Sequence, residues 1–279
     1  MRRGVFTNLP PPLSLRVRGS PGWEDWGKSA TVKRPSRSVA YVLTAADGDS
    51  YTRAVPPTPR ERIPWEEAAR SAAAERARVE AGELWGRDGR EVAPFNYRWE
   101  HVRSVVRIAD GLAKRLGADR EVVRAAAWLH DLAKERIAEA VDEMDDHGVR
   151  GAELAREKLG TTDFPTDKID AVCDAIEKHV GLIREQAVEP LEAAILWDAD
   201  KLSKIGLEAT VQFIATRPAL EPGFTVRDFW DWGSEWLELA SKMAASMNTE
   251  PAREMAEERY RAQVALYDSL AQEVGIQDG

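Results

Sequence analysis

The chain of 279 residues has only one cysteine, Cys173. A single thiol excludes an intramolecular disulfide framework and a cysteine-rich zinc site, and it fits a reducing compartment. No stretch reaches the ~18 consecutive apolar residues that a membrane helix needs, so we expect no membrane-spanning segment. Arg2 and Arg3 are not followed by the apolar run of an export signal, because prolines at positions 10–12 interrupt it. Together these absences predict a cytoplasmic protein.

Acidic residues outnumber basic ones outside the first part of the chain. Lys and Arg total 39 against 48 Asp and Glu, which gives a net charge of −9. An acidic protein is poorly suited to coat a phosphate backbone, so we expect no stable nucleic-acid partner. Residues 1–60 differ, because they carry ten Lys and Arg against four Asp and Glu.

The same region is rich in proline, with nine of the 15 prolines at or before Pro64. Proline removes backbone donors and resists helix formation, and few apolar residues accompany it here. We therefore expect residues 1–64 to form a basic, Pro- and Arg-rich extension that is largely irregular. Residues 38–55 are the exception, since two β-prone runs flank Ala-Asp-Gly-Asp and predict a short hairpin.

A segment of this extension, residues 22–29, matches the P-loop expression G-x-x-x-x-G-K-[ST]. A functional P-loop follows a buried strand and opens a helix. Here Pro21 precedes the segment and Pro35 falls inside the helix that would follow. Glu24 and Asp25 within the loop would also repel phosphate. We therefore interpret the match as accidental.

From residue 65 onward the spacing of apolar residues is helical, and no convincing strand appears after residue 60. The pattern predicts helices at residues 65–85, 97–117, 119–136, 149–159, 166–180, 189–206, 225–246 and 249–274. Residues 65–279 are thus predicted to be one all-α domain, long enough to bury a substantial core.

The whole chain has only four histidines, and all lie in the predicted helical domain: His101, His130, His147 and His179. His101 and His179 fall on the inward faces of their helices, in register with apolar residues. A buried neutral imidazole needs partners for both ring nitrogens. Taken singly, each is most simply a core histidine hydrogen bonded to a carbonyl oxygen.

Acidic residues occur in two strongly apolar contexts. Asp131 follows His130 at the end of the run AAAWLHDLAK, and Asp198 and Asp200 lie in the apolar segment ILWDADKL. A buried carboxylate is costly unless it is paired or binds a metal. The helical wheel places Asp198 on the apolar stripe and Asp200 opposite, but a helix that is apolar on both sides can present either one inward.

In chain order, His101, His130-Asp131, His147, His179 and Asp200 resemble the H…HD…H…H…D pattern of the HD superfamily of metal-dependent phosphohydrolases. The local sequences that carry the resemblance are YRWEHVRSVVRIA, VRAAAWLHDLAKE, HGVRGAELAREKL, IEKHV and ILWDADKLSKIG. The similarity covers roughly residues 95–274 and implies an HD-domain helical bundle.

The resemblance also implies a set of site residues. His101, His130, Asp131 and Asp200 would hold one metal ion, and Asp131 would bridge to a second ion held by His147 and His179. The family pattern selects Asp200 as the last ligand, which leaves Asp198 as a candidate to support the ligands from behind. Mixed nitrogen and oxygen ligands suit two divalent transition-metal ions, Mn, Fe, Co, Ni or Zn, and argue against calcium.

In the mechanism that follows, Asp131 would position a metal-bound hydroxide for attack on phosphorus. Lys134, one turn after His130, could contact a phosphate oxygen as a point charge. Lys201 and Arg184 are weaker candidates for the same role, since each is at least equally well explained as a solvated cation.

The implied function is that of a phosphatase or phosphodiesterase acting on a small phosphorylated substrate, such as a nucleotide. The Gly-Tyr-Pro motif of cyclic-di-GMP phosphodiesterases is absent after Asp131, which argues against that subclass. Two alternatives are an HD-type di-iron oxygenase and a non-catalytic, metal-containing helical binding module. Trp230, Trp232 and Trp236 could cap a pocket or stack on a base, although packing is the commoner role of such a cluster.

Overall fold

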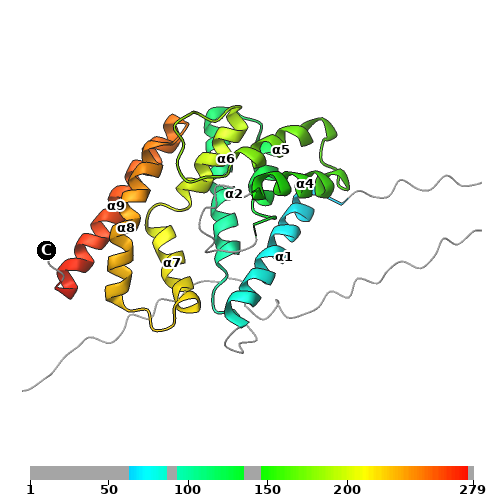
Figure 1. Cartoon of the computed structure of the whole chain (residues 1–279). Helices are drawn as coiled ribbons and strands as arrows, with labels where there is room; N and C mark the ends of the chain where they lie inside the picture. The colour runs from blue at the N-terminus through cyan, green and yellow to red at the C-terminus, as the bar shows by residue number, and fades with distance from the viewer. Residues whose placement is uncertain (1–62, 87–92, 135–145, 276–279) are drawn as a thin grey trace, which may run out of the picture. The chain divides into compact units, whose positions relative to one another are not determined.

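The computed structural model describes residues 63–86, 93–134 and 146–275, all within the unit Pro59–Gly279. The predicted irregular extension, its hairpin and the P-loop-like segment fall outside the described residues, apart from positions 63 and 64. The described helices are α1 (Trp65–Trp85), α2 (Tyr97–Leu116), α3 (Arg120–Leu129), α4 (His147–Gly160), the 3₁₀ turn η3 (Thr166–Lys168), α5 (Ile169–Lys178), α6 (Leu191–Leu202), α7 (Leu207–Leu220), α8 (Val226–Ala245) and α9 (Glu250–Val274) (Figure 1).

The all-α prediction is confirmed for the described residues, where the single β contact is one bridge between Ile63 and Thr162. None of these helices combines the length and the apolar character needed to cross a bilayer. Local sequence explains several helix ends. The Asn96 side chain accepts a hydrogen bond at the start of α2, and Gly117 ends that helix in the left-handed conformation, with φ 71°.

Helix α6 lies at the centre of the packing. Every residue from Ala193 to Leu202 is buried, and the helix contacts α2, α3, α5, α8 and α9. A helix that is buried on all sides has apolar residues on every face. The sequence alone therefore could not show which way Asp198 and Asp200 point. Helices α8 and α9 pack side by side as a hairpin next to α6 and α7 (Figure 1).

Helix α7 was not predicted from the sequence. Its apolar residues do not form one stripe: Leu207, Val211 and Ile214 are exposed while Phe213 lines a cavity. Pro218 in its last turn further weakens the helical pattern. The prediction for residues 119–136 was wrong at its end, because α3 stops at Leu129 and the chain turns through His130 and Asp131.

Candidate metal centre

The four histidines of the chain converge on one buried site, each from a different helix end or face. His101 projects from α2, His130 and His179 follow the last residues of α3 and α5, and His147 opens α4. Neighbouring imidazole rings lie 5.1–5.4 Å apart between centroids, in the order His101, His130, His179, His147. All four are at least nine-tenths buried. Residues separated by up to 78 positions therefore form one cluster.

Three of these histidines are fixed in the same orientation by hydrogen bonds from Nδ1. His130 donates from Nδ1 to the Ala127 carbonyl at 2.9 Å, and His179 donates to the Ile176 carbonyl. The Ser203 hydroxyl donates to the Asp200 carbonyl, so it accepts from Nδ1 of His101 at 3.0 Å. Because the proton is held on Nδ1 in each ring, each Nε2 presents a lone pair to the site.

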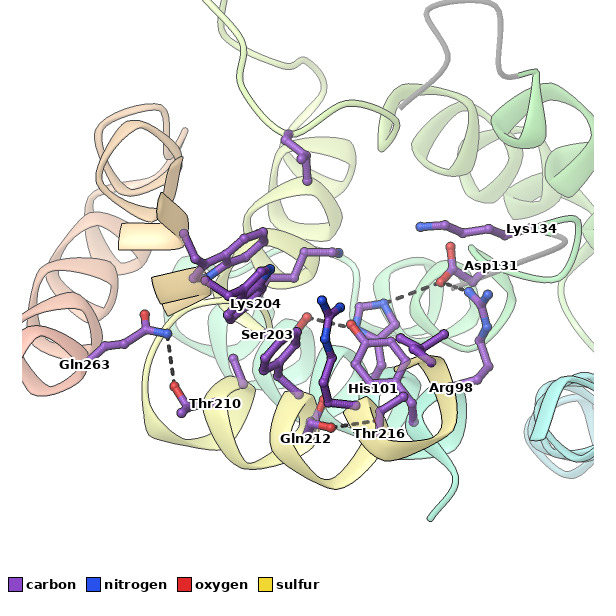
Figure 2. Close-up of a pocket in the computed structure, with 18 residues that line it drawn as sticks. Arg98, His101, Asp131, Lys134, Ser203, Lys204, Thr210, Gln212, Thr216 and Gln263 are labelled. Carbon is purple, nitrogen blue, oxygen red and sulfur yellow. Dashed lines mark hydrogen bonds and ion pairs between the residues drawn. The ribbon is translucent and has the colours of Figure 1, made fainter. Parts of the chain in front are cut away.

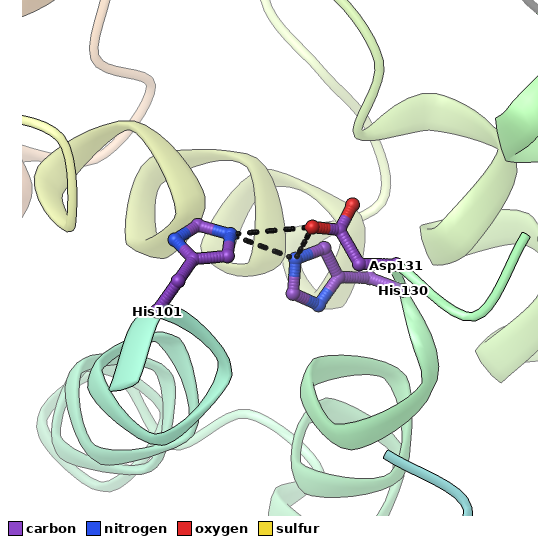
Figure 3. Close-up of side chains that lie close together, drawn as sticks. All are labelled: His101, His130 and Asp131. Atoms are coloured by element: carbon purple, nitrogen blue, oxygen red, sulfur yellow. Dashed lines mark hydrogen bonds and ion pairs between the residues drawn. The ribbon is translucent and has the colours of Figure 1, made fainter. Parts of the chain in front are cut away.

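Two carboxylates face these Nε2 atoms. Asp131 Oδ2 lies 3.5 Å from His101 Nε2 and 3.6 Å from His130 Nε2 (Figure 3). The other oxygen, Oδ1, lies 3.7 Å from His179 Nε2. Asp200 Oδ1 lies 3.2 Å from His101 Nε2 and 3.9 Å from His130 Nε2. Asp131 thus uses one oxygen toward each half of the cluster.

The donor atoms form two overlapping groups in which every ligand atom lies within 4.8 Å of the others. One group is His101, His130 and Asp131, and the other is Asp131, His147 and His179. Asp200 is outside the first group but reaches both of its histidines. Two imidazole lone pairs that face each other repel unless a cation lies between them, so the donor set fits a divalent metal ion.

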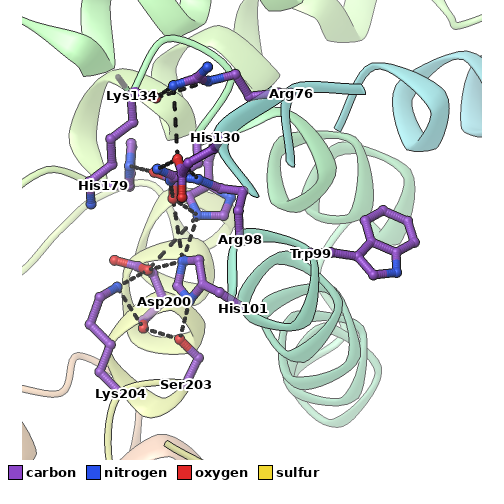
Figure 4. A network of polar contacts seen from close by, with 12 residues as sticks. Arg76, Arg98, Trp99, His101, His130, Lys134, His179, Asp200, Ser203 and Lys204 are labelled. Atoms are coloured by element: carbon purple, nitrogen blue, oxygen red, sulfur yellow. Dashed lines mark hydrogen bonds and ion pairs between the residues drawn. The ribbon is translucent and has the colours of Figure 1, made fainter. Parts of the chain in front are cut away.

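A buried arginine binds the same Asp131 oxygen that faces His101 and His130. Arg98 donates from Nη1 to Asp131 Oδ2 and from Nε to Glu80 Oε2 of α1 at 2.8 Å (Figure 4). Both Arg98 and Glu80 are less than 5% exposed. Burial opposes ionisation of Asp131, but the nearby Lys134 and Arg98 charges hold its pKa well below the usual range.

Asp200 is held by two lysines that follow it in the sequence. Lys201 donates from Nζ to Asp200 Oδ2 and, at 2.8 Å, to the His179 carbonyl. Lys204 donates to Asp200 Oδ1, and burial lowers the pKa of Lys204 to about 8. The interpretation of Lys201 as a solvated cation is wrong, since this side chain is 1% exposed.

Asp198 does not support the histidines. Its carboxylate accepts four hydrogen bonds from the α8–α9 turn, two from Asn248 and two from Thr249, at 2.7–2.9 Å. Arg184 is half-buried and donates to the Val180 carbonyl at 3.1 Å. This hydrogen bond explains the position of its guanidinium without a bound phosphate. Cys173 is buried and donates to the Ala152 carbonyl.

The cluster opens into a cavity of about 530 Å³. His101, Asp131 and Lys134 line one part of it (Figure 2), and residues of α7 and α8 line another. The Lys134 ammonium has no hydrogen-bond partner among the described residues, whereas its carbonyl accepts two bonds from Arg76. Lys134 therefore has a fixed backbone and an amino group available at the cavity wall.

Sequence reasoning missed Arg98, Glu80 and Lys204 as parts of this site. Arg98 stands three residues before His101, so it shares the inward face of α2. A cation on an otherwise buried helix face was a signal that could have found it. Glu80 lies in the predicted helix at residues 65–85, and no local pattern links it to Arg98.

Comparison with known proteins agrees with this architecture. Residues 98–205 match the HD domain family. A protein of Lactobacillus plantarum is 21% identical, with a TM-score of 0.51 over 76% of this chain and 98% of that chain. An HD-superfamily hydrolase of Bacillus thuringiensis is 20% identical, with a TM-score of 0.50 over 76% of this chain and all of that chain. A predicted HD superfamily hydrolase of an uncultured Thermotogales bacterium is 24% identical, with a TM-score of 0.48 over 76% of this chain and 94% of that chain.

Proposed function

We propose that this protein is a metal-dependent phosphohydrolase that cleaves a phosphate ester of a nucleotide or a similar small molecule, and the match of residues 98–205 to the HD domain family supports this proposal. The observation that carries the proposal is the shared direction of three Nε2 lone pairs toward Asp131 and Asp200 beside an open cavity. In a cluster with a purely structural role, we would expect each Nε2 atom to accept a hydrogen bond from a neighbouring donor.

We assign His101, His130, Asp131 and Asp200 to one metal ion, and Asp131, His147 and His179 to a second. Bound there, divalent transition-metal ions would activate water for attack and offset charge on the phosphoryl group. Asp131 is suited to face both ions, because its two oxygens point to different histidines. Arg98 holds that carboxylate in place by donating to Oδ2.

The charge of the cavity supports an anionic substrate. Its lining includes Arg98, Lys134, Lys204 and Arg217 but a single acidic residue, Asp131. The chain as a whole has a net charge of −9. The excess of cationic side chains along the cavity is therefore opposite in sign to the net charge of the protein. Lys134 is the cation best placed to bind a phosphate oxygen, since its ammonium is not engaged by a described acceptor.

The proposal is tested by combining elemental analysis with an activity screen. Protein purified without chelators should contain about two transition-metal ions per chain and should release phosphate or alcohol from simple phosphate esters. A His130→Asn variant should lose both metal and activity, since asparagine can still donate to the Ala127 carbonyl but offers no imidazole lone pair. A folded protein that binds no Mn, Fe, Co, Ni or Zn would overturn the proposal.

A purely iron-loaded, coloured protein that is inert toward phosphate esters would instead support the di-iron oxygenase. A metal-loaded protein that is inert toward both phosphate esters and oxygen would support the binding module.

A further inference from the structure

Part of the cavity wall is formed by residues of α7 and α8. Both helices lie outside residues 98–205, the segment that matches the HD domain. We call this part the ring subsite and define it by Gln212, Phe213, Arg217, Trp232 and Trp236. The metal centre and Lys134 line the same cavity, so one bound molecule can contact both ends (Figure 2).

The apolar wall of the ring subsite is flat. Phe213 and Trp232 stack with ring centroids 3.4 Å apart and an interplanar angle of 8°. Trp236 continues the stack at 5.3 Å and 13°, and the Arg217 guanidinium lies 5.1 Å from the Phe213 centroid. Arg217 and Trp232 therefore cover Phe213, so an entering ring would meet Trp236 or the ring edges. Such a wall favours planar partners over branched ones.

Two polar side chains beside this wall, Gln212 and Arg217, have hydrogen-bonding atoms that no described residue engages. Gln212 is 5% exposed and lines the cavity, and no hydrogen bond to its carboxamide is present among the described residues. The Arg217 Nε atom is buried and has no partner in the described structure, although its Nη2 binds Glu221 at 2.8 Å. A buried polar atom without a partner, such as Arg217 Nε, is costly. A ligand with an acceptor for Arg217 and both acceptors and donors for the Gln212 carboxamide would satisfy these groups.

We propose that the ring subsite binds a planar, nitrogen-containing aromatic ring on the leaving group of the substrate, while the phosphoryl group lies at the metal centre. The inference rests on the proposed phosphohydrolase function and narrows its substrate class to nucleoside phosphates and similar heteroaryl esters. In the reaction, water forms a bond to phosphorus as the P–O bond to the nucleoside breaks. The products are the nucleoside, which takes up a proton, and inorganic phosphate.

Cavity size supports this substrate class. A volume of about 530 Å³ falls within the range of pockets that enclose small organic ligands. A compact ester such as a sugar phosphate would leave the aromatic wall and Gln212 without contacts. Such an ester would gain no binding free energy from contacts with α7 and α8.

The test compares two substrates that differ only in the ring. Adenosine 5′-monophosphate and ribose 5-phosphate share the same phosphate ester and sugar, so the ratio of their kcat/KM values isolates the ring. Stacking and hydrogen bonding to the ring predict a ratio of at least about 10 for the metal-loaded, full-length protein. A ratio near 1 would overturn the inference.

Variants locate the effect. Trp236→Leu and Gln212→Met should each reduce the ratio at least about threefold, because each removes one type of ring contact. Trp230→Leu is the matched control, since this tryptophan lies on the same helix but does not line the cavity. It should keep the wild-type ratio, and an equal loss in Trp230→Leu would overturn the assignment to the ring subsite.

A binding measurement separates failure of this inference from failure of the proposed function. Adenosine carries the ring but no phosphate, and its binding can be followed by calorimetry. Adenosine binding that Trp236→Leu weakens, together with no cleavage of either ester, would retain the ring subsite and reject the phosphohydrolase. Cleavage of both esters at equal rates, with no adenosine binding, would retain the phosphohydrolase and reject the ring subsite.

Discussion

The Nε2 atoms of His101 and His130 lie 3.4 Å apart. Since both rings donate from Nδ1, the two Nε2 atoms bring unshared pairs together in a site from which water is largely excluded. Either a proton or a cation must relieve this contact. Burial lowers the pKa of His130 to about 3, so near neutral pH a metal ion is the better candidate.

Metal ions should therefore stabilise the protein strongly. A ligand that binds only the folded state at 100 times its Kd contributes about 2.7 kcal/mol to the free energy of unfolding. For a unit of this size, the melting temperature should rise by roughly 5–10 °C. Calorimetry of chelator-treated protein with and without Mn or Ni measures the shift. His130→Asn should abolish it, and an unchanged shift in that variant would remove His130 from the ligand set.

The metal-free protein should lose stability as the pH falls below about 6.5. His130 has a lowered pKa in the folded state but an ordinary pKa near 6.5 when unfolded. The unfolded state then binds the extra proton, and the free energy of unfolding decreases by up to about 1.4 kcal/mol per pH unit until the pH approaches 3. Urea denaturation of wild type and His130→Asn between pH 7 and 5 measures the difference. Equal pH slopes would contradict the lowered pKa.

Asp198 and Asp200 are separated by one residue and should differ in what they affect. Asp198→Asn places an amide donor against the donors of Asn248 and Thr249, so we expect a loss of about 2–3 kcal/mol in the free energy of unfolding. Its metal content should stay at the wild-type value. Asp200→Asn should reduce metal affinity, because Oδ1 faces both His101 and His130. Calorimetric metal titration and thermal unfolding of both variants decide the assignment, which is wrong if Asp198→Asn loses the metal.

This pair also marks how far the sequence could predict the site. The resemblance to the HD pattern selected His101, His130, Asp131, His147, His179 and Asp200, and the structure brings all six together. The partners of Asp198 lie 50 positions or more away, in a turn between two helices. No local periodicity encodes such a contact, because it depends on how α9 packs against α6.

The same limit applies to helix α7 and to Glu80. The helix faces the cavity on one side and solvent on the other with apolar residues on both, so it lacks the stripe that marks a surface helix. Glu80 reads as one of several acidic residues in α1, and only the fold shows that it meets a buried arginine. Elements that build the cavity were therefore harder to predict than the clustered histidines and aspartates.

Arg98 forms buried ion pairs with both Glu80 and Asp131, so removing its charge should strongly destabilise the fold. Arg98→Met leaves two buried carboxylates without their cation, and we expect a loss of about 3–5 kcal/mol in the free energy of unfolding. Adding Glu80→Gln to this variant should recover part of the loss, since one of the uncompensated charges is removed. A double-mutant cycle by urea denaturation measures the coupling, and strictly additive effects would show that the pair does not act together.

Glycine packing between α8 and α9 offers a prediction independent of the metal centre. A Cβ atom on Gly233 would lie 1.8 Å from Tyr267 Cε1, and Tyr267 is 2% exposed. The ring cannot move freely because it stacks on Phe229 at 5.0 Å. Gly233→Ala should therefore lower the free energy of unfolding by about 1–3 kcal/mol through overpacking. Gly111→Ala in α2 is the matched control, because nothing lies within 4 Å of its Cβ position. That variant should gain up to about 1 kcal/mol from helix propensity. If thermal unfolding moved both variants in the same direction, helix propensity rather than the contact with Tyr267 would govern position 233.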